Sequence, residues 1–142
     1  MNRNEMKIEF GSDPRNESFA RVVVASFMTR TNPTLEEVAD VKTAVSEAVT
    51  NSIIHGYGQK EGTIEIRAYI EERKLYIEIT DYGCGIEDVE KAMEPMFTTG
   101  KDGRSGMGFS FMEAFMDELT VESEPGKGTT VKMAKKIGAG CA

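Results

Sequence analysis

Two neighbouring segments of the chain alternate between apolar and polar residues, and this pattern constrains the fold more than any other feature. Residues 63–70 place isoleucine or alanine at every second position, and residues 74–80 continue the pattern with leucine and isoleucine. A strand with one buried face shows this period of two. Because only residues 71–73 separate the two segments, we predict an antiparallel hairpin with one face buried.

Helical patterns lie on the N-terminal side of this hairpin. Residues 15–31 carry an apolar stripe at helical spacing and are followed by Asn32-Pro33, which stops a helix. Thr34 then precedes Glu37 by three positions. This capping box predicts a second helix that runs to about His55.

The remaining predicted elements complete one small domain. They are strands at 6–10, 119–122 and 129–133 and helices at 87–93 and 107–116. Helices that can cover one face of about five strands predict an α+β fold, a two-layer sandwich of a mixed, mostly antiparallel sheet with helices on one face. We expect one domain over residues 1–134 and a flexible tail over residues 135–142.

Composition and charge argue against several classes of function. The net charge of -7 disfavours nucleic acid or an anionic membrane as the main partner. No stretch reaches the roughly 20 apolar residues of a membrane helix, and the first residues lack the apolar core of a signal peptide. Two distant cysteines and one histidine suit neither a disulfide framework nor a zinc site, so we expect a reducing cytoplasm.

One row of polar side chains lies along the second predicted helix. Glu47, Asn51 and His55 are spaced four residues apart and therefore share a face. The amide oxygen of Asn51 is a hard ligand of the kind that Mg²⁺ takes alongside water and phosphate oxygens. Glu47 has the chemistry of a general base for an attacking hydroxyl, or of a group that orients water. The alternative is a solvated helix face, which is the commoner meaning of an isolated pair at this spacing.

A second polar segment comes where the predicted strand at 74–80 ends. Asp81 is followed by Gly83 and Gly85 at alternate positions. Its carboxylate can accept a hydrogen bond from the exocyclic amine of adenine, and the glycines let a flat ring approach the backbone. A tight turn without a ligand is the alternative, because turns favour the same residues.

A glycine-rich segment precedes the predicted helix at 107–116. Gly103, Gly106 and Gly108 leave backbone N–H groups bare near a helix N-terminus, where anions bind. Residues 94–105 form a polar loop longer than a compact domain usually carries without a function. The glycine spacing matches neither a P-loop nor a dinucleotide-binding motif, and the alternative is a flexible loop.

Taken in order, these segments and a late Gly128-Thr129-Thr130 resemble the ATP-binding fold shared by DNA gyrase, heat-shock chaperones, sensor histidine kinases and mismatch-repair ATPases. The resemblance covers roughly residues 35–134. It implies that Asn51 holds Mg²⁺, that Asp81 recognises adenine with support from a threonine of the last motif, and that the glycine segment covers the triphosphate. The nucleotide-binding residues that it implies are Asn51, Asp81, Gly83, Gly85, Ile86, Thr98, Thr99, Arg104, Ser105, Gly106, Met107, Gly108, Phe109 and Thr129 or Thr130.

A closer resemblance is to the small serine kinases that double as anti-sigma factors, in particular those of sporulation. It rests on Ser46 to Tyr57, Met96 to Thr99 and Arg104 to Phe109. It implies ATP and Mg²⁺ as cofactors. It also implies a homodimer that inhibits a sporulation sigma factor of RNA polymerase and phosphorylates a serine of an anti-anti-sigma antagonist.

The same resemblance assigns roles to further residues. Glu47 is implied to be the general base that activates the substrate serine. Glu17 and Arg21, four residues apart on the first predicted helix, resemble the partner-docking face of this group. The alternative for this pair is a surface ion pair worth under about 1 kcal/mol. The strand at 6–10 is a candidate edge for pairing across subunits.

Three other functions compete with this one. A nucleotide-binding regulator that acts by sequestration without phosphotransfer has no need of Glu47 as a base. An ATPase module for nucleic-acid work is disfavoured by the acidic balance of the chain. A sensor histidine kinase is disfavoured because His55 is the only histidine and lies within the helix expected to face ATP.

Overall fold

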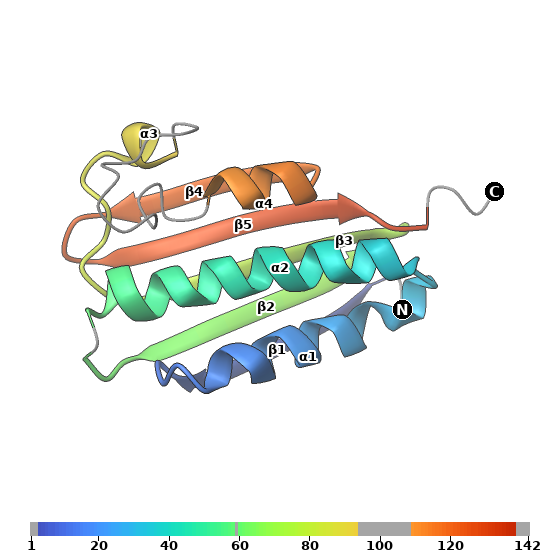
Figure 1. Cartoon of the computed structure of the whole chain (residues 1–142), viewed down its shortest axis with the longest axis horizontal. Coiled ribbons are helices and arrows are strands. Elements are labelled where there is room, and N and C mark those ends of the chain that lie inside the picture. The colour runs from blue at the N-terminus through green and yellow to red at the C-terminus, as the bar shows by residue number, and fades with distance from the viewer. Residues whose placement is uncertain (1–2, 59, 94–108, 139–142) are drawn as a thin grey trace.

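The chain folds into two layers, a five-stranded sheet with helices on one face. The computed structural model describes residues 3–58, 60–93 and 109–138. Figure 1 shows α1 (Asn16–Met28) and α2 (Leu35–Asn51) side by side over the sheet, with α4 (Phe109–Phe115) beside α2. The predicted α+β sandwich is therefore confirmed.

The sheet has the strand order β1-β2-β3-β5-β4. Its strands are β1 (Asn4–Gly11), β2 (Thr63–Glu71), β3 (Lys74–Asp81), β4 (Glu118–Glu124) and β5 (Gly128–Lys136). Each pairing between these described strands is antiparallel, whereas a mixed sheet was predicted. The reason lies partly in α1 and α2, an up-and-down pair that returns the chain to the end where β1 stopped, so that Gly11 pairs with Thr63.

The predicted hairpin is formed by β2 and β3. Its register pairs Glu71 with Lys74 and leaves a two-residue turn of Glu72 and Arg73. Both turn residues have a positive φ, of 50° and 65°. A two-residue turn with this left-handed backbone matches the twist of the strands that it joins.

α2 begins at the capping box that the sequence predicts. The Thr34 hydroxyl accepts a hydrogen bond from the Glu37 amide at 3.0 Å, and the Glu37 carboxylate accepts one from the Thr34 amide at 2.8 Å. The helix ends in a π-helical turn at Ser52–Gly56, a type of turn that changes which side chains share a face. Shorter elements are a 3₁₀ turn at Thr29–Thr31 after α1 and helix α3 (Val89–Ala92) after β3.

The hydrophobic core lies between the helices and the sheet. Its members come from both layers and include Val24, Val45, Ile66, Ile77 and Phe109, none of which is more than 1% exposed. Burying a side chain of this size stabilises the fold by about 1.5–3 kcal/mol relative to leaving it in water. The packing of these core side chains fixes α2 and α4 on the sheet and so determines where the polar side chains of the two helices lie. No helix within the described ranges combines the length and hydropathy needed to cross a bilayer.

The C-terminal end of β5 continues past the predicted domain boundary at residue 134. Ile137 is 1% exposed, and the Gly138 amide donates to the Glu37 carboxylate at 3.1 Å. Residues 135–138 therefore belong to the domain rather than to the tail predicted from residue 135. Burial of Ile137 provides the physical reason, because one apolar side chain anchors the end of the strand. Residues 139–142 lie outside the described ranges.

Candidate nucleotide-binding site

The C-terminal end of α2 forms one wall of a cavity. Asn51 and the next residue, Ser52, line it and are 9% and 4% exposed. His55 and Gly56 of the π-helical turn continue this wall. Asn51 thus brings a buried carboxamide to this cavity, a group whose oxygen is of the kind that Mg²⁺ takes as a ligand.

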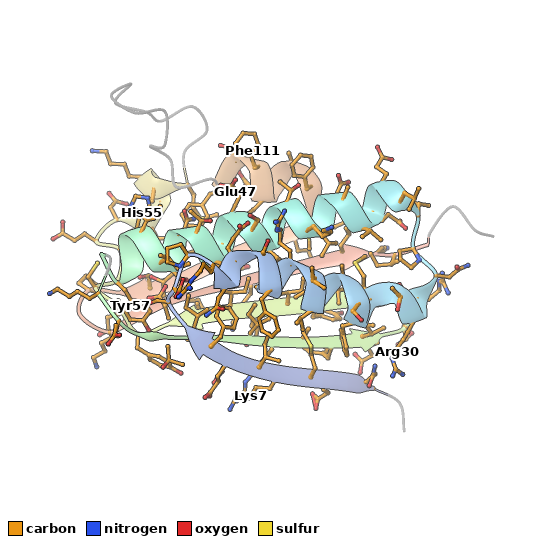
Figure 2. All side chains as sticks on the ribbon, turned by 60° about the horizontal axis from the view of Figure 1, so that its bottom comes forward. Lys7, Arg30, Glu47, His55, Tyr57 and Phe111 are labelled. Carbon is orange, nitrogen blue, oxygen red and sulfur yellow. The ribbon has the colours of Figure 1, made fainter. Side chains whose placement is uncertain are left out.

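Glu47 lies one turn before Asn51 on the same helix. Its side chain is half-buried, and Figure 2 shows it extending from α2, with His55 further along towards the end of that helix. Burial raises the pKa of the Glu47 carboxyl above its ordinary value, and the negative charge of Glu17 raises it further. A raised pKa makes a carboxylate a better proton acceptor, which suits the predicted general base.

Asp81 faces α2 from the end of β3. The carboxyl is 4% exposed and accepts a hydrogen bond from the Gly83 amide at 2.9 Å. The Ser52 hydroxyl and the Thr129 amide also donate to it. Burial nevertheless raises the pKa of Asp81, because the hydrogen bonds that favour the charged form do not fully offset desolvation.

Glycines hold the turn after Asp81 against the end of α2. A Cβ on Gly83 would lie 2.0 Å from the carbonyl oxygen of Gly56, and a Cβ on Gly56 would lie 2.9 Å from the Asp81 carboxyl. The two backbones are joined by a hydrogen bond from the Cys84 amide to the Gly56 carbonyl at 2.8 Å. The absence of these two side chains therefore lets Asp81 approach α2 closely.

β5 supplies a further wall and brings one of the two candidate threonines to the cavity. Thr129 lines the cavity with Gly85, Ile86 and Phe109. The Thr130 hydroxyl instead lies 3.1 Å from that of Thr80, its partner on β3. Successive residues of a strand point to opposite faces, so only one of the two threonines can face the cavity.

The structure brings together predicted residues from four segments of the chain, α2, the end of β3 with its turn, α4 and β5. Asn51, Asp81, Gly85, Ile86, Phe109 and Thr129 line the one cavity. Gly83 lies behind Asp81, at the contact with Gly56. The predicted residues Thr98, Thr99, Arg104, Ser105, Gly106, Met107 and Gly108 lie outside the described ranges.

The predicted docking pair lies on α1. Arg21 Nε is 3.4 Å from Glu17 Oε2, so the ion pair considered as the alternative is present. The same oxygen of Glu17 accepts a hydrogen bond from the Ser46 hydroxyl on α2. Phe19 and Val22 of α1 are 50% and 60% exposed. Glu17 thus joins α1 to α2 through Ser46, the residue before Glu47. The exposed Phe19 and Val22 lie on another face of α1 than Glu17 and Arg21.

Sequence reasoning missed three residues that support the cavity. Ser52 donates to Asp81, and the Ser123 hydroxyl accepts a hydrogen bond from the Ile86 amide at 2.8 Å. Ser123 also lies 2.7 Å from the Thr129 hydroxyl. The third residue, Tyr57, joins the turn after Asp81 to β2. Their role comes from contacts across the fold, for which the local sequence carries no signal.

The donors and acceptors of the cavity fit a magnesium-bound adenine nucleotide. In the described part of the chain, His, Cys, Asp and Glu side chains form no group of three or more suited to a metal ion. One carboxamide, Asn51, suits Mg²⁺ because this ion keeps several waters and takes further oxygens from phosphates. The ionised Asp81 carboxylate offers about four acceptor positions, and donors from Gly83, Ser52 and Thr129 account for three, so one is left for an amine donor.

The chain is similar in sequence to known proteins. A family model described as a histidine kinase-like ATPase domain matches residues 10–135. Curated proteins named anti-sigma F factor are similar over nearly the whole chain. The protein from Thermoanaerobacter sp. (strain X514) is 60% identical over 137 residues, covering 96% of both chains. The one from Caldanaerobacter subterraneus subsp. tengcongensis is 61% identical over 136 residues, covering 95% of both.

Solved structures with the same fold are more distant in sequence. The RsbU and RsbW domains of a Mycobacterium tuberculosis protein align with a TM-score of 0.68 at 17% identity, over 94% of this chain and 32% of that one. The nucleotide-free catalytic domain of the histidine kinase ThkA aligns with a TM-score of 0.58 at 17% identity, over 93% and 96% of the two chains. At this identity the likeness concerns the fold alone.

Proposed function

The chain belongs to the histidine kinase-like ATPase domain family and, within it, to the anti-sigma F factors, and from this membership we propose that it is an ATP-dependent protein-serine kinase that binds and inhibits a sporulation sigma factor. Its substrate is then a serine of an anti-anti-sigma antagonist. The observation that carries the proposal is that Asn51, Asp81 and Thr129 line one cavity although they are remote in the sequence.

In this proposal the cavity binds the adenosine end of ATP. Asp81 accepts a hydrogen bond from the adenine amine, and Thr129 holds the carboxylate through its amide. Asn51 supplies an oxygen for Mg²⁺, which when bound neutralises charge on the phosphates. Gly83 and Gly85 serve the close packing of the turn rather than access for the base, because a Cβ on either would meet backbone, that of Gly56 or of Glu124. The predicted phosphate-binding residues at 98–99 and 104–108 belong to the part of the chain outside the described ranges.

Glu47 is the proposed general base for phosphotransfer. Its carboxylate takes the proton of the substrate serine as the serine oxygen bonds to the terminal phosphorus and the bond to the ADP oxygen breaks. The half-buried position of Glu47 and its raised pKa support this role, because both increase the affinity of the carboxylate for a proton.

The partners are proposed from family membership and from the surface of α1. Exposed Phe19 and Val22, on the same helix as the ion pair of Glu17 and Arg21, suit a protein partner better than bulk water. β1 is an edge strand, which supports pairing of two copies into a homodimer. We propose a cytoplasmic protein that acts on a sigma factor rather than on nucleic acid or a membrane.

Transfer of label from ATP to the antagonist tests the proposal. The purified protein is incubated with γ-labelled ATP, Mg²⁺ and the anti-anti-sigma protein of the same organism. We expect label on a serine of that protein, and Glu47→Gln should reduce the rate by about 10²- to 10⁴-fold because the proton acceptor is lost.

Glu36→Gln is the matched control for this experiment. Glu36 is exposed on the first turn of α2, and its substitution removes the same charge from the same helix. Its rate should equal that of the wild type. Undiminished transfer by Glu47→Gln would show that another group is the base. Sigma-factor binding without any transfer by the wild type would favour the alternative, a regulator that acts by sequestration alone.

A further inference from the structure

Tyr57 joins three segments at the end of the molecule where the cavity lies. Its hydroxyl donates a hydrogen bond to the Thr63 carbonyl of β2 at 2.5 Å and accepts one from the Tyr82 amide at 2.8 Å. Figure 2 shows Tyr57 near the same end of the molecule as His55. One side chain thus connects the end of α2, the start of β2 and the turn after β3.

The ring of Tyr57 is held firmly in this position. It packs against the hydrophobic core, and a Cβ on Gly62 would lie 2.3 Å from a ring carbon, so the ring rests directly on bare backbone. Burial raises the pKa of the hydroxyl above its ordinary value of 10.0. The hydroxyl therefore keeps its proton at neutral pH and can donate to Thr63 while it accepts from Tyr82.

The amide that Tyr57 binds directly follows Asp81. The next amide, that of Gly83, donates to the Asp81 carboxylate itself. Both peptide groups after Asp81 are thus held, the first by Tyr57 and the second by the carboxylate. Together they limit rotation of the backbone and of the side chain at Asp81, which fixes the direction of its carboxylate.

From this arrangement we propose that Tyr57 is a positioning residue for adenine recognition, which acts by anchoring the amide after Asp81 and so aiming the carboxylate at the exocyclic amine. The inference rests on the proposed nucleotide site. Tyr57 is not among the residues that line the cavity, and its hydroxyl is occupied by Thr63 and Tyr82. Its effect should therefore depend on the amine that Asp81 recognises and not on the phosphates.

Binding of two diphosphates separates this role from a structural one. ADP carries the exocyclic amine, whereas inosine diphosphate carries a carbonyl oxygen in its place. Calorimetry would give the Kd of both ligands for the wild type and for Tyr57→Phe, which removes only the hydroxyl. We expect the variant to bind ADP about 3- to 10-fold more weakly, the loss typical of one hydrogen bond, and inosine diphosphate within about twofold of the wild type.

Tyr82→Phe is the matched control, because it removes a hydroxyl from the same turn but from a side chain that is 62% exposed. It should leave both affinities unchanged. A second measurement is exchange of the Tyr82 amide proton with solvent, which should speed up in Tyr57→Phe because the amide loses its acceptor.

Two results would overturn the inference. Equal weakening of both ligands, together with a lower Tm, would mean that Tyr57 only stabilises the fold. An ADP affinity within about twofold of the wild type would mean that the hydroxyl does not act on Asp81. If the wild type itself does not prefer ADP, the adenine role of Asp81 in the proposed function fails, and the role of Tyr57 fails with it.

Discussion

Gly83→Ala tests whether close contact between two backbones maintains the nucleotide cavity. The new Cβ would lie 2.0 Å from the Gly56 carbonyl oxygen and 2.3 Å from its carbon, whereas Cβ atoms essentially never come closer than 3.0 Å. Both neighbours are backbone atoms, so no side chain can rotate away. The turn after Asp81 and the end of α2 must therefore separate by about 1 Å or more.

This separation has a calculable consequence. The Cys84 amide and the Gly56 carbonyl, now 2.8 Å apart, are the hydrogen bond that joins the same two segments. Losing a bond of this kind and leaving its groups unpaired costs about 1–3 kcal/mol. If that loss falls on the cavity, the affinity for ADP decreases about 5- to 150-fold. Because φ of Gly83 is not positive, alanine adds no backbone strain of its own.

The assay is calorimetric titration with ADP, accompanied by thermal unfolding without ligand. Gly11→Ala is the matched control, since its Cβ would meet no atom within 4 Å. We expect the control to bind ADP normally, with a stability equal to or slightly above that of the wild type. An affinity of Gly83→Ala within twofold of the wild type would refute the argument that this contact shapes the cavity.

Three further predictions concern the magnesium ligand, the adenine carboxylate and the contact between the helices. Asn51→Ala should lose the magnesium-dependent part of ADP binding, measured by calorimetry with and without a chelator, and keep most of its Tm. Asp81→Asn should weaken the binding of ADP by about 1–3 kcal/mol in the same assay, because the charged acceptor is lost. Because burial raises the Asp81 pKa, this carboxyl contributes stability that is full below its ordinary 3.8 and is lost as pH rises through the raised pKa. In thermal melts at successive pH values, the Tm should therefore fall more steeply with rising pH for the wild type than for Asp81→Asn. Ser46→Ala should lower the free energy of unfolding by about 1–2 kcal/mol in urea titrations, since Glu17 loses a donor from α2; an unchanged midpoint would mean that the hydroxyl does not hold α1 to α2.

The elements with strong local patterns were predictable from the sequence. The capping box at Thr34 and Glu37 is formed as expected, because both of its hydrogen bonds lie within one helical turn. The alternation of apolar and polar residues in β2 and β3 likewise indicated which face of the hairpin is buried. The turn between them was predicted as residues 71–73 but contains two residues, since Glu71 and Lys74 still pair. Neither turn residue is glycine, so nothing in the local residue pattern indicated their positive φ.

The parts of the site that depend on register were less predictable. Period-two alternation states that Thr129 and Thr130 face opposite ways, but only the pairing of β5 with β3 shows which one faces the cavity. The π-helical turn at Ser52–Gly56 poses the same difficulty. The periodicity of apolar residues does not show where the backbone hydrogen bonds change from the α-helical to the longer π-helical spacing. Such features follow from packing between distant segments.

α2 connects the two proposed activities through its own rigidity. The Ser46 hydroxyl of α2 donates a hydrogen bond to Glu17, a residue of the proposed docking surface on α1. Further along α2, Asn51 lines the cavity. Five residues of helix separate them, or about 7.5 Å along the axis. Because Ser46 and Asn51 belong to one uninterrupted helix, a displacement of the helix at Ser46 would move Asn51 with it. Glu47 lies between the two in the sequence, so the contact of α1 with Ser46 also bears on the position of the proposed base.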